Sequence, residues 1–330
     1  MQIAVSIVAR VLLTFSLPLF LVLIASGGPG DSRAADDLVL GYTNLNGAKV
    51  PVPLGVDERI FVNHGIDLKI VPVSPGTQGV PKLLAGEIDI FLGNSEPVVR
   101  AIALERQRLA VVASLGPDQF FLFSRSSIRS AEELRGKRIG SSTAGASADR
   151  NTKMALRKLG LDPERDVQIV YTGHQNSLDR MKVLAQGGVD ASVAGADALP
   201  ELGQAADRVH RLIDLSDVGI YVSGADISVK RDSLERRRDA MQRFIRALEE
   251  AYRLAKARPD LVRRIYQKYL KAESPVTLEW MVKAYGDAKV PERPLPDRRA
   301  VASHIAEIMS KQPDVPKDTA AYIDESLFSK

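Results

Sequence analysis

Short apolar strands alternate with amphipathic helices through the first two thirds of the chain, and this alternation constrains the fold most. Apolar patterning predicts strands at residues 38–42, 66–73, 88–92, 109–115, 138–141, 167–172 and 189–193. Helices are predicted between them at residues 52–63, 79–85, 96–105, 147–159, 177–186 and 199–206. Strands that alternate with helices build βαβ units around a mainly parallel sheet, so we expect an α/β fold.

One supersecondary unit occurs twice, about a hundred residues apart, which indicates two similar lobes. The segment Lys82-Leu-Leu-Ala85, followed by Gly86-Glu-Ile-Asp89, matches Lys182-Val-Leu-Ala185, followed by Gly187-Gly-Val-Asp190. Each copy leads into an apolar strand, then a loop of small residues, then a helix. The match predicts a duplicated architecture and leaves gene duplication open.

The last third of the chain is helical. Residues 233–257 place apolar side chains at helical spacing, and further helices are predicted at 261–270, 278–285 and 298–309. We expect these helices to pack on the first lobe, with the chain crossing between lobes at residues 120–124 and 216–221. Two crossings make a hinge. The predicted first lobe is residues 35–121 with 219–330, and the second is 122–218.

Composition excludes several classes of protein. The 330 residues contain 45 basic and 41 acidic side chains, and this mild excess is spread along the sequence, so nucleic acid is not an expected partner. The absence of cysteine removes disulfides, thiolate metal sites, cysteine nucleophiles and lipid attachment at an N-terminal cysteine.

The N-terminus has the order of a secretory signal peptide. Arg10 supplies a positive charge, residues 11–25 are almost wholly apolar, and small residues follow. Ser32-Arg33-Ala34 predicts cleavage after Ala34, so the signal peptide is residues 1–34. The alternative is an uncleaved anchor, but the apolar stretch is shorter than the roughly 20 residues of a spanning helix, and Pro18 interrupts it. Either reading predicts a periplasmic protein.

The richest candidate site is the loop from Ser141 to Ser147. In α/β sheets, ligands bind beyond the carboxyl ends of the strands, and this loop joins a strand to a helix. It offers four hydroxyls and unhindered backbone N–H groups at a helix N-terminus, which suits an anion. The alternative is an ordinary hydroxyl-rich loop with Ser147 as N-cap. The predicted ligand contacts here are Ser141, Ser142, Thr143 and Gly145.

Other strand-end loops complete the predicted site. Capping and turn formation explain their polar residues about as well as ligand binding does. The candidate residues in these loops are Thr43, Asn44, Gly76, Thr77, Asn94, Ser95, Thr172, Gly195 and Asp197.

Charged residues near these loops leave the ligand's charge open. Glu96 and Asp197 stand at predicted helix starts, where they either complement the helix dipole or face the cleft, repelling an anion or binding the amine of a zwitterion. Arg100, Arg150 and Lys153 lie within helices and are expected on the surface. A bidentate arginine clamp on a strongly charged anion is therefore not predicted, and a neutral or aromatic ligand remains an alternative.

Enzymatic patterns are weak, so no catalytic residue, cofactor or metal is predicted. The four histidines have no metal-ligand spacing. Residues 93–97 lack the second glycine of a nucleophile elbow. Asp89 and Asp190 look like paired carboxylates, but they occupy equivalent strand starts away from the predicted cleft, where turn capping explains them better.

Several segments together resemble the periplasmic substrate-binding proteins of ABC importers for nitrate, sulfonates and taurine. They are His64-Gly-Ile-Asp-Leu68, Leu83-Leu-Ala-Gly-Glu-Ile-Asp89, Glu133-Leu-Arg-Gly-Lys-Arg-Ile-Gly140, residues 184–190 and Arg258-Pro259-Asp260. The resemblance implies a type II-like binding-protein fold of two α/β lobes with two hinge crossovers and extra C-terminal helices on the first lobe. It also implies a monomer that binds a small organic or inorganic anion, such as a sulfonate, nitrate, taurine or an aromatic carboxylate, and delivers it to an inner-membrane permease.

Alternatives use the same fold. A sensory module would pass the ligand signal to a membrane kinase or cyclase, and a periplasmic enzyme would use the cleft for catalysis. A related group makes the thiamine pyrimidine and relies on a cysteine-rich segment, which this chain lacks. A transcription-factor effector domain is disfavoured by the N-terminal signal.

Overall fold

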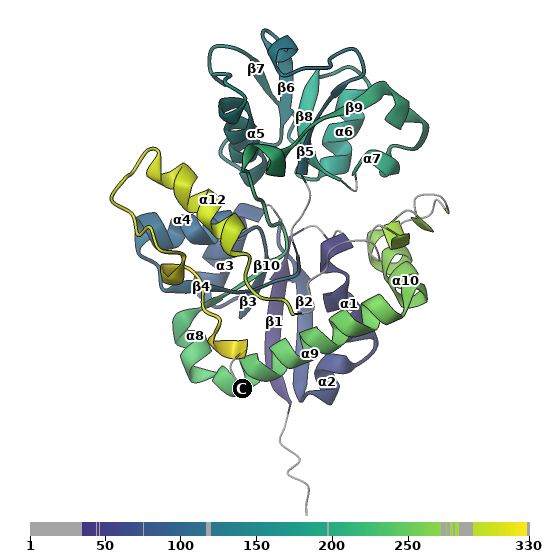
Figure 1. The fold of residues 1–330 in the computed structure, drawn as a ribbon. Helices are drawn as coiled ribbons and strands as arrows, with labels where there is room; N and C mark the ends of the chain where they lie inside the picture. Colours follow the sequence, from purple (N-terminus) through teal and green to yellow (C-terminus); the bar gives the residue numbers. More distant parts are fainter. Residues whose placement is uncertain are drawn as a thin grey trace, which may run out of the picture. The chain divides into compact units, whose positions relative to one another are not determined.

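Two five-stranded sheets, each flanked by helices, form two α/β lobes (Figure 1). The computed structural model describes residues 35–43, 45, 47–74, 76–116, 120–196, 198–271, 275, 278–279, 281–283 and 293–328. The predicted signal peptide lies outside these residues. Within the described ranges, no helix is both long and apolar enough to cross a membrane.

The first sheet has the strand order β2-β1-β3-β10-β4. Its strands are β1 (Asp36–Tyr42), β2 (Ile66–Pro72), β3 (Ile90–Gly93), β4 (Leu109–Ser114) and β10 (Asp226–Lys230). β1 pairs in parallel with β2 and β3, whereas β10 runs antiparallel between β3 and β4. β10 was not predicted, because its short sequence contains Asp226 and Ser228, which are buried polar residues.

The second sheet repeats this order as β7-β6-β8-β5-β9. Its strands are β5 (Phe120–Arg125), β6 (Arg138–Ser141), β7 (Gln168–Tyr171), β8 (Ala191–Gly195) and β9 (Val209–Asp214). Here β5 takes the place of β10, running antiparallel between β8 and β9. The irregularity in the β10 ladder at Ile227/Ser228 recurs in the β5 ladder at Leu122/Phe123.

The α/β fold class with two crossovers is confirmed, but the expected crossover segment is wrong in detail. Residues 120–124, predicted as a crossing, form the antiparallel strand β5, and residues 209–214 form the unpredicted strand β9. The chain passes between the sheets just outside these strands, between β4 and β5 and between β9 and β10. The antiparallel strand of each sheet therefore adjoins a crossover, a position that a simple βαβ pattern does not predict.

Helices flank both sheets. They are α1 (Pro51–Asp57), α2 (Ile60–Asn63), α3 (Gly79–Ala85), α4 (Glu96–Glu105), α5 (Ser147–Lys158), α6 (Ser177–Ala185), α7 (Ala198–Glu201), α8 (Arg231–Arg236), α9 (Arg238–Ala257), α10 (Pro259–Leu270) and α12 (Arg298–Met309). Short 3-10 helices occupy Gly47–Lys49, Gly76–Gln78, Glu132–Leu134, Gly203–Arg208, Leu215–Val218, Thr319–Ala321 and Ser326–Phe328.

Two predicted helices are each interrupted by one left-handed residue. The predicted helix at 52–63 breaks at Arg59, whose φ is 58°. The break turns Phe61 back onto Gly55, where an added Cβ would lie 2.6 Å from the Phe61 ring. The predicted helix at 199–206 ends early, and a 3-10 helix begins at Gly203, whose φ is 56°. Tertiary packing and one glycine thus override the helical pattern.

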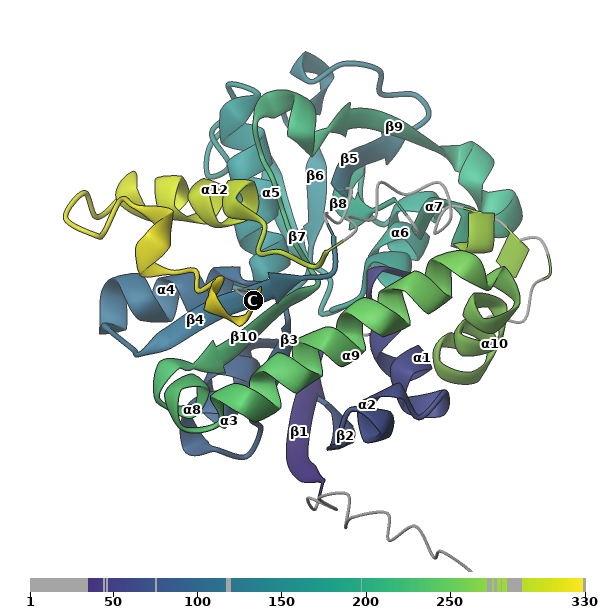
Figure 2. The ribbon, with the colours of Figure 1, turned by 60° about the horizontal axis from the view of Figure 1, so that its bottom comes forward.

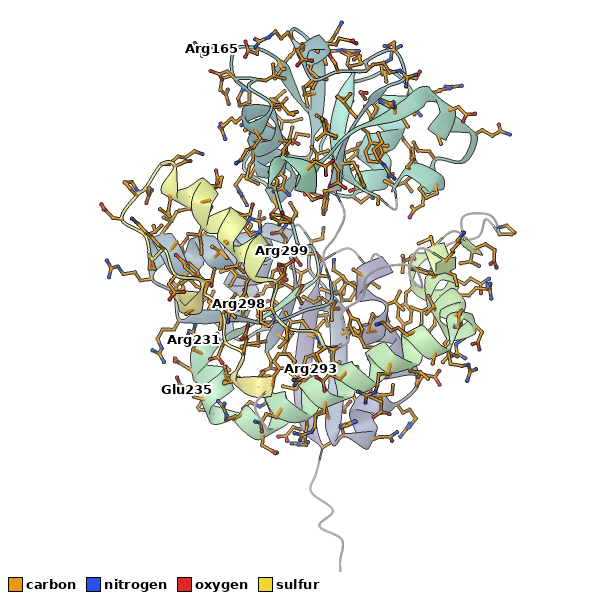
Figure 3. The ribbon with its side chains drawn as sticks, in the orientation of Figure 1. Arg165, Arg231, Glu235, Arg293, Arg298 and Arg299 are labelled. Atoms are coloured by element: carbon orange, nitrogen blue, oxygen red, sulfur yellow. The ribbon has the colours of Figure 1, made fainter. Side chains whose placement is uncertain are left out.

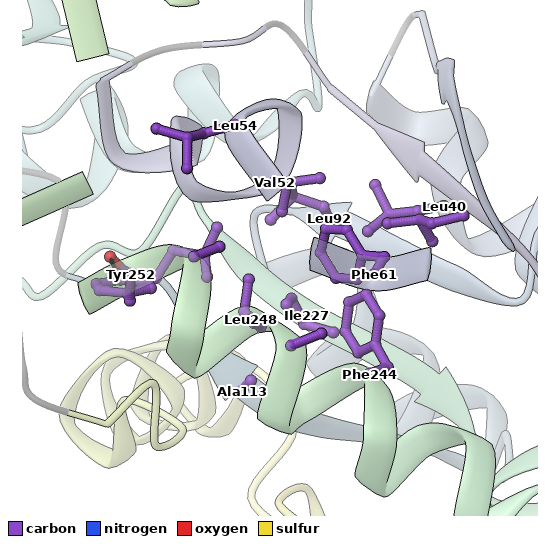
Figure 4. Packing of buried hydrophobic residues seen from close by; sticks show 14 of the residues in the cluster. Leu40, Val52, Leu54, Phe61, Leu92, Ala113, Ile227, Phe244, Leu248 and Tyr252 are labelled. Atoms are coloured by element: carbon purple, nitrogen blue, oxygen red, sulfur yellow. Dashed lines mark hydrogen bonds between the residues drawn. The ribbon is translucent and has the colours of Figure 1, made fainter. Parts of the chain in front are cut away.

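Alternate residues of the first sheet point into two separate cores. Leu38, Leu40 and Leu92 face α1, α2, α9 and α10, while Phe91 faces α3, α4 and α12. The long helix α9 lies along α1 and α2 (Figure 2). Its Phe244 ring stacks on Phe61 with 5.5 Å between ring centroids (Figure 4). The C-terminal helices thus bury their apolar faces on the first lobe, as predicted.

Arginines fasten the C-terminal segment to the first lobe and to the second crossover (Figure 3). Arg231 Nη1 of α8 donates to Asp324 at 3.2 Å, while within the C-terminal segment itself Arg298 Nε donates to Glu325 at 3.0 Å. The Arg299 guanidinium lies over the ring of Tyr221, 4.9 Å from its centroid. Tyr221 lies on the chain between β9 and β10, so α12 contacts the crossover itself.

Asp89 and Asp190 hold equivalent strand starts in the two lobes. Asp89 accepts a hydrogen bond from Val39 N at 2.9 Å, and Asp190 accepts one from Arg138 N at 3.0 Å. Arg237 and Arg138 pair with these carboxylates. Both aspartates therefore tie neighbouring strands together, which is a structural role different from the turn capping that the sequence suggested.

Candidate ligand-binding site

The first-lobe candidates lie beyond the carboxyl ends of β1, β2 and β3. Thr43 Oγ1 accepts a hydrogen bond from the buried Lys49 ammonium at 3.1 Å. Gly76 lies beside Thr43, since a Cβ there would be 3.2 Å from Thr43 Cγ2. Thr77 is exposed in the same loop. Asn94 Oδ1 accepts from Glu96 N at 2.7 Å, so this side chain supports the start of α4.

A buried polar cluster that the sequence did not reveal lies next to Ser95. Asp226 begins β10 opposite Gly93 and Ser114, and it accepts a hydrogen bond from Ser223 Oγ at 2.8 Å. Burial raises the pKa of Asp226 to about 6, although the Ser95, Ser223 and Ser114 hydroxyls oppose that rise. Ser95 Oγ and Asp226 Oδ2 nevertheless make no hydrogen bond of normal geometry with the described residues.

The second-lobe candidates at the ends of β6 and β7 are brought together. Ser141 O accepts hydrogen bonds from Thr172 N at 3.0 Å and from Thr172 Oγ1 at 2.8 Å. Gly173 N donates to Ser142 O at 3.0 Å. Thr143 is exposed, and its Oγ1 accepts from Gln175 Nε2 at 3.3 Å. The two loops thus form one hydrogen-bonded rim.

The N-terminus of α5 carries no side-chain cap among the described residues. Its N-cap is Ala146 rather than Ser147, so the alternative that Ser147 caps this helix is wrong. Asp149 instead reaches back and accepts from Gly145 N at 2.9 Å, and Gly145 has a φ of 73°. Glycine accommodates that left-handed turn without the strain a side chain would add.

Arg180 joins the loops at the ends of β7 and β8. Its Nη1 donates to the carbonyls of His174, Gln175 and Asn176 at 3.2, 2.9 and 3.0 Å. Its Nη2 donates to Val193 O and to Ser177 Oγ, each at 3.3 Å. Burial lowers the pKa of Arg180 to about 10, so it stays charged at neutral pH.

Gly195 belongs to the same arrangement. Its backbone N–H donates to Ser177 Oγ at 3.2 Å, and the residue is buried at the end of β8. The candidates Asn44 and Asp197 lie outside the described residues.

Arg150 was expected on the surface, and this prediction is wrong. Its guanidinium bonds to Gly145 O in its own lobe and to Glu96 at the start of α4 in the other lobe. The side chains of Arg150 and Glu96 are only 18% and 3% exposed. Glu96 also accepts from Arg100 Nε at 3.0 Å. Arg100 and Lys153, also expected on the surface, are 33% and 21% exposed.

A buried histidine lies near this ion pair. Burial and, after it, the Arg150 charge lower the pKa of His304 on α12 to about 4, against the influence of Glu307 and Asp297. His304 Nε2 has no hydrogen-bond partner among the described residues. Within those residues, no group of three or more histidines and carboxylates could hold a metal ion.

Three predicted contacts share one property. Ser95, Ser141 and Ser142 are fully buried, and their hydroxyls have no hydrogen-bond partner within the described chain. All three lie at carboxyl ends of strands, one in the first lobe and two in the second. Buried polar groups are normally hydrogen-bonded, so the Ser141 and Ser142 donors are suited to an acceptor that the chain itself does not supply, whereas Ser95 also interacts with the Asp226 carboxylate.

Solved structures that share this fold include two periplasmic binding proteins and one enzyme. No curated protein sequence matches the chain. The periplasmic aliphatic sulphonate binding protein SsuA from Escherichia coli is 20% identical, with a TM-score of 0.66 over 89% of this chain and 92% of SsuA. The periplasmic nitrate-binding protein NrtA from Synechocystis PCC 6803 is 11% identical, with a TM-score of 0.66 over 89% of this chain and 87% of NrtA. The desulfurization enzyme DSZB is 18% identical, with a TM-score of 0.62 over 89% of this chain and 98% of DSZB.

The sequence also matches a family described as NMT1/THI5 like over residues 58–261, which is more than half of the 330 residues. The matched region begins directly after α1, includes every strand except β1, and ends at the start of α10. It therefore includes the crossovers and most of the strand-end loops described above. The chain belongs to the NMT1/THI5-like family.

Proposed function

We propose that this protein is an extracytoplasmic solute-binding receptor of an ABC importer, and that its ligand is a small anion held by the strand-end loops of both lobes. In this proposal, the loops of the two lobes close on the ligand, and the closed form docks on a membrane permease. Contacts that both lobes make with the ligand would stabilise closure.

The observation that carries the proposal is the set of buried, unpartnered hydroxyls on Ser95, Ser141 and Ser142. A hydroxyl removed from water without an acceptor costs roughly 1–3 kcal/mol. A ligand that offers oxygen acceptors would recover that cost at both Ser141 and Ser142. The uncapped N-terminus of α5 adds backbone donors and the positive end of a helix dipole.

Two further observations support an anionic ligand: the pairing of Glu96 with arginines, and the similarity of the fold to that of two binding proteins. Glu96 is neutralised by Arg100 and Arg150, so it does not present a free negative charge to the loops. This removes one objection to an anion that the sequence raised. Two proteins of the same fold are named for sulphonate and nitrate, which are both oxyanions.

A thermal-shift screen tests the proposal. The purified protein is mixed with nitrate, alkanesulfonates, aminosulfonates, aromatic carboxylates and pyrimidines. A ligand at about a hundred times its dissociation constant adds roughly 2.7 kcal/mol to the free energy of unfolding. We expect an upward shift of the melting temperature with one class of anion. Shifts with pyrimidines alone, or with no compound, would contradict the proposal.

Serine variants separate ligand contacts from structural hydroxyls. Ser142→Ala removes a hydroxyl that bonds to nothing in the described chain, so the empty protein should gain up to the roughly 1–3 kcal/mol that the unpartnered hydroxyl costs. Affinity for the anion found in the screen should fall about tenfold or more, the usual loss for a hydrogen bond to a charged group. The control is Ser127→Ala, at an exposed turn, which should leave affinity unchanged. Equal affinities for both variants would count against the site.

An enzyme is the second candidate, because a desulfurization enzyme has the same fold. Incubating the protein with each bound compound and analysing the compound by mass spectrometry tests this directly. A compound recovered intact supports the receptor. A compound that is converted, with turnover lost in Ser142→Ala, supports the enzyme.

A further inference from the structure

Arg180 is a buried cation with an unusual set of partners. It is 2% exposed, and all of its hydrogen bonds go to four backbone carbonyls and one serine hydroxyl. Its Nε has no partner within the described chain. Buried arginines usually pair with a carboxylate, because an isolated charge is costly in a medium of low dielectric. Arg180 therefore has a role that simple packing does not explain.

Among the described residues, the acidic side chain that influences the pKa of Arg180 is engaged elsewhere. Asp179 accepts from Asn176 Nδ2 at 2.6 Å and from Lys182 Nζ at 3.2 Å. It influences Arg180 only through space. The positive charge of Arg180 is thus only partly balanced by its surroundings.

The place of this charge in the fold connects it to the candidate site. Arg180 holds the backbone of residues 174–176, directly after Thr172, and the carbonyl of Val193, two residues before Gly195. Ser177 Oγ links it to Gly195 N. Moving the charge would disturb both loops, and neutralising it would change the electrostatic potential beneath them.

We propose that Arg180 is a positioning and specificity-determining residue, which fixes the loop after β7 and the end of β8 and makes the second lobe select an anionic over a neutral ligand. This inference rests on the proposed function. Arg180 acts through the loops and through its field, and it does not touch the ligand. Because the charge is buried, added salt would screen it only weakly.

Matched pairs of ligands test the charge preference separately from affinity. Isothermal titration calorimetry on the full chain compares 1-butanesulfonate with 1-butanesulfonamide, and benzoate with benzamide, at low and high salt. Within each pair the two molecules have similar shape and differ in charge. We expect Arg180→Met to lower the ratio of anion affinity to neutral affinity about tenfold. Arg180→Lys keeps the charge and loses the fork of hydrogen bonds, so both affinities fall while their ratio stays within about twofold.

Two other variants control for net charge and folding. Arg157→Met removes an exposed cation of α5 and should leave the ratio unchanged. Asp179→Asn keeps an acceptor for Asn176 while removing the nearby negative charge, so it should raise the ratio about two- to threefold. This variant tests the inference even if Arg180→Met does not fold.

The outcomes separate the inference from the proposed function. A wild-type protein that binds neither member of any pair and none of the anions in the thermal-shift screen overturns both. A wild-type protein that prefers the anion, with ratios unaltered in Arg180→Met or in Asp179→Asn, overturns the role of Arg180 alone.

Discussion

Asp226 is a fully buried carboxylate between the two crossovers, surrounded by serine hydroxyls rather than cations. Ser114, which ends β4, and Ser223, which precedes β10, share a hydrogen bond of 3.2 Å above it. Burial raises its pKa from 3.8 to about 6, so the folded protein binds this proton more tightly than the unfolded chain does. The stability that Asp226 contributes is therefore complete below pH 4 and is lost as the pH rises through 6.

Asp226→Asn should remove this pH dependence. The amide carries no charge to bury, so the variant should gain roughly 3 kcal/mol in the free energy of unfolding relative to wild type at pH 8, and little at pH 4. Urea denaturation at several pH values measures the difference. The exposed carboxylate variant Asp217→Asn is the control. A gain for Asp226→Asn that is equal at pH 4 and pH 8 would contradict the assignment.

Individual site residues were only partly predictable. Ser141 and Ser142 followed from their position after an apolar strand, because strand ends meet at one edge of a parallel sheet. The cluster at Asp226 did not, since its members are far apart in sequence and meet only when β10 inserts beside β4. Arg150 was misjudged because helical periodicity does not show that a side chain turns back toward its own N-terminus.

At the scale of elements, α9 organises the first lobe. Its apolar face, which includes Phe244, Leu248 and Tyr252, packs over α1 and α2 (Figure 4). The stack of Phe244 on Phe61 depends on the break at Arg59, which sets the direction of α2. The packing of α9 on the first lobe thus depends on the turn at Arg59 that precedes α2.

Phe244→Ala should destabilise the protein by about 3–5 kcal/mol, because it removes a fully buried ring and leaves a cavity against Phe61. Arg246→Ala on the exposed side of the same helix should change the free energy of unfolding by less than about 0.5 kcal/mol. Urea denaturation compares the two variants. Similar losses for both would mean that α9 does not pack on α2 in solution.

Regular elements were predictable where one physical signal dominated. β4 is buried along its whole length and reads as an apolar run, and α9 shows a clean helical period. β9 and β10 were missed because buried polar residues and charged ends obscure the strand pattern. The break at Arg59 was missed because a left-handed arginine has no sequence signal, and only the packing of Phe61 requires it.

At the scale of the whole molecule, Arg150 and Glu96 connect the lobes outside the crossovers. Both side chains are largely buried, and the pair extends through Arg100 to Glu307 on α12, with a distance of 3.4 Å between Arg100 and Glu307. Relative motion of the lobes must break or shift this connection. The Arg150–Glu96 ion pair therefore contributes to the free-energy difference between this arrangement of the lobes and any other in which the pair is broken.

A double-mutant cycle with Glu96→Gln and Arg150→Gln should give a coupling free energy of about 1–3 kcal/mol, as expected for charges in contact and shielded from water. The control cycle uses Arg108 and Asp232, which lie 2.7 Å apart but are 62% and 51% exposed. Its coupling should stay below about 0.5 kcal/mol. Equal couplings from urea denaturation of the two sets would show that the lobes are not joined in this way.

Because β10 belongs to the first sheet but follows the whole second sheet in the sequence, the two sheets are completed in a fixed order during synthesis. All strands of the second sheet, from β5 to β9, are contiguous in the sequence, whereas the first sheet lacks β10 until residue 230 has been made. Until then β3 and β4 have no strand between them, and their open edges are templates for aggregation. The second lobe can fold as soon as it leaves the ribosome. The first lobe must wait, and is the part of a nascent chain that a chaperone would need to hold.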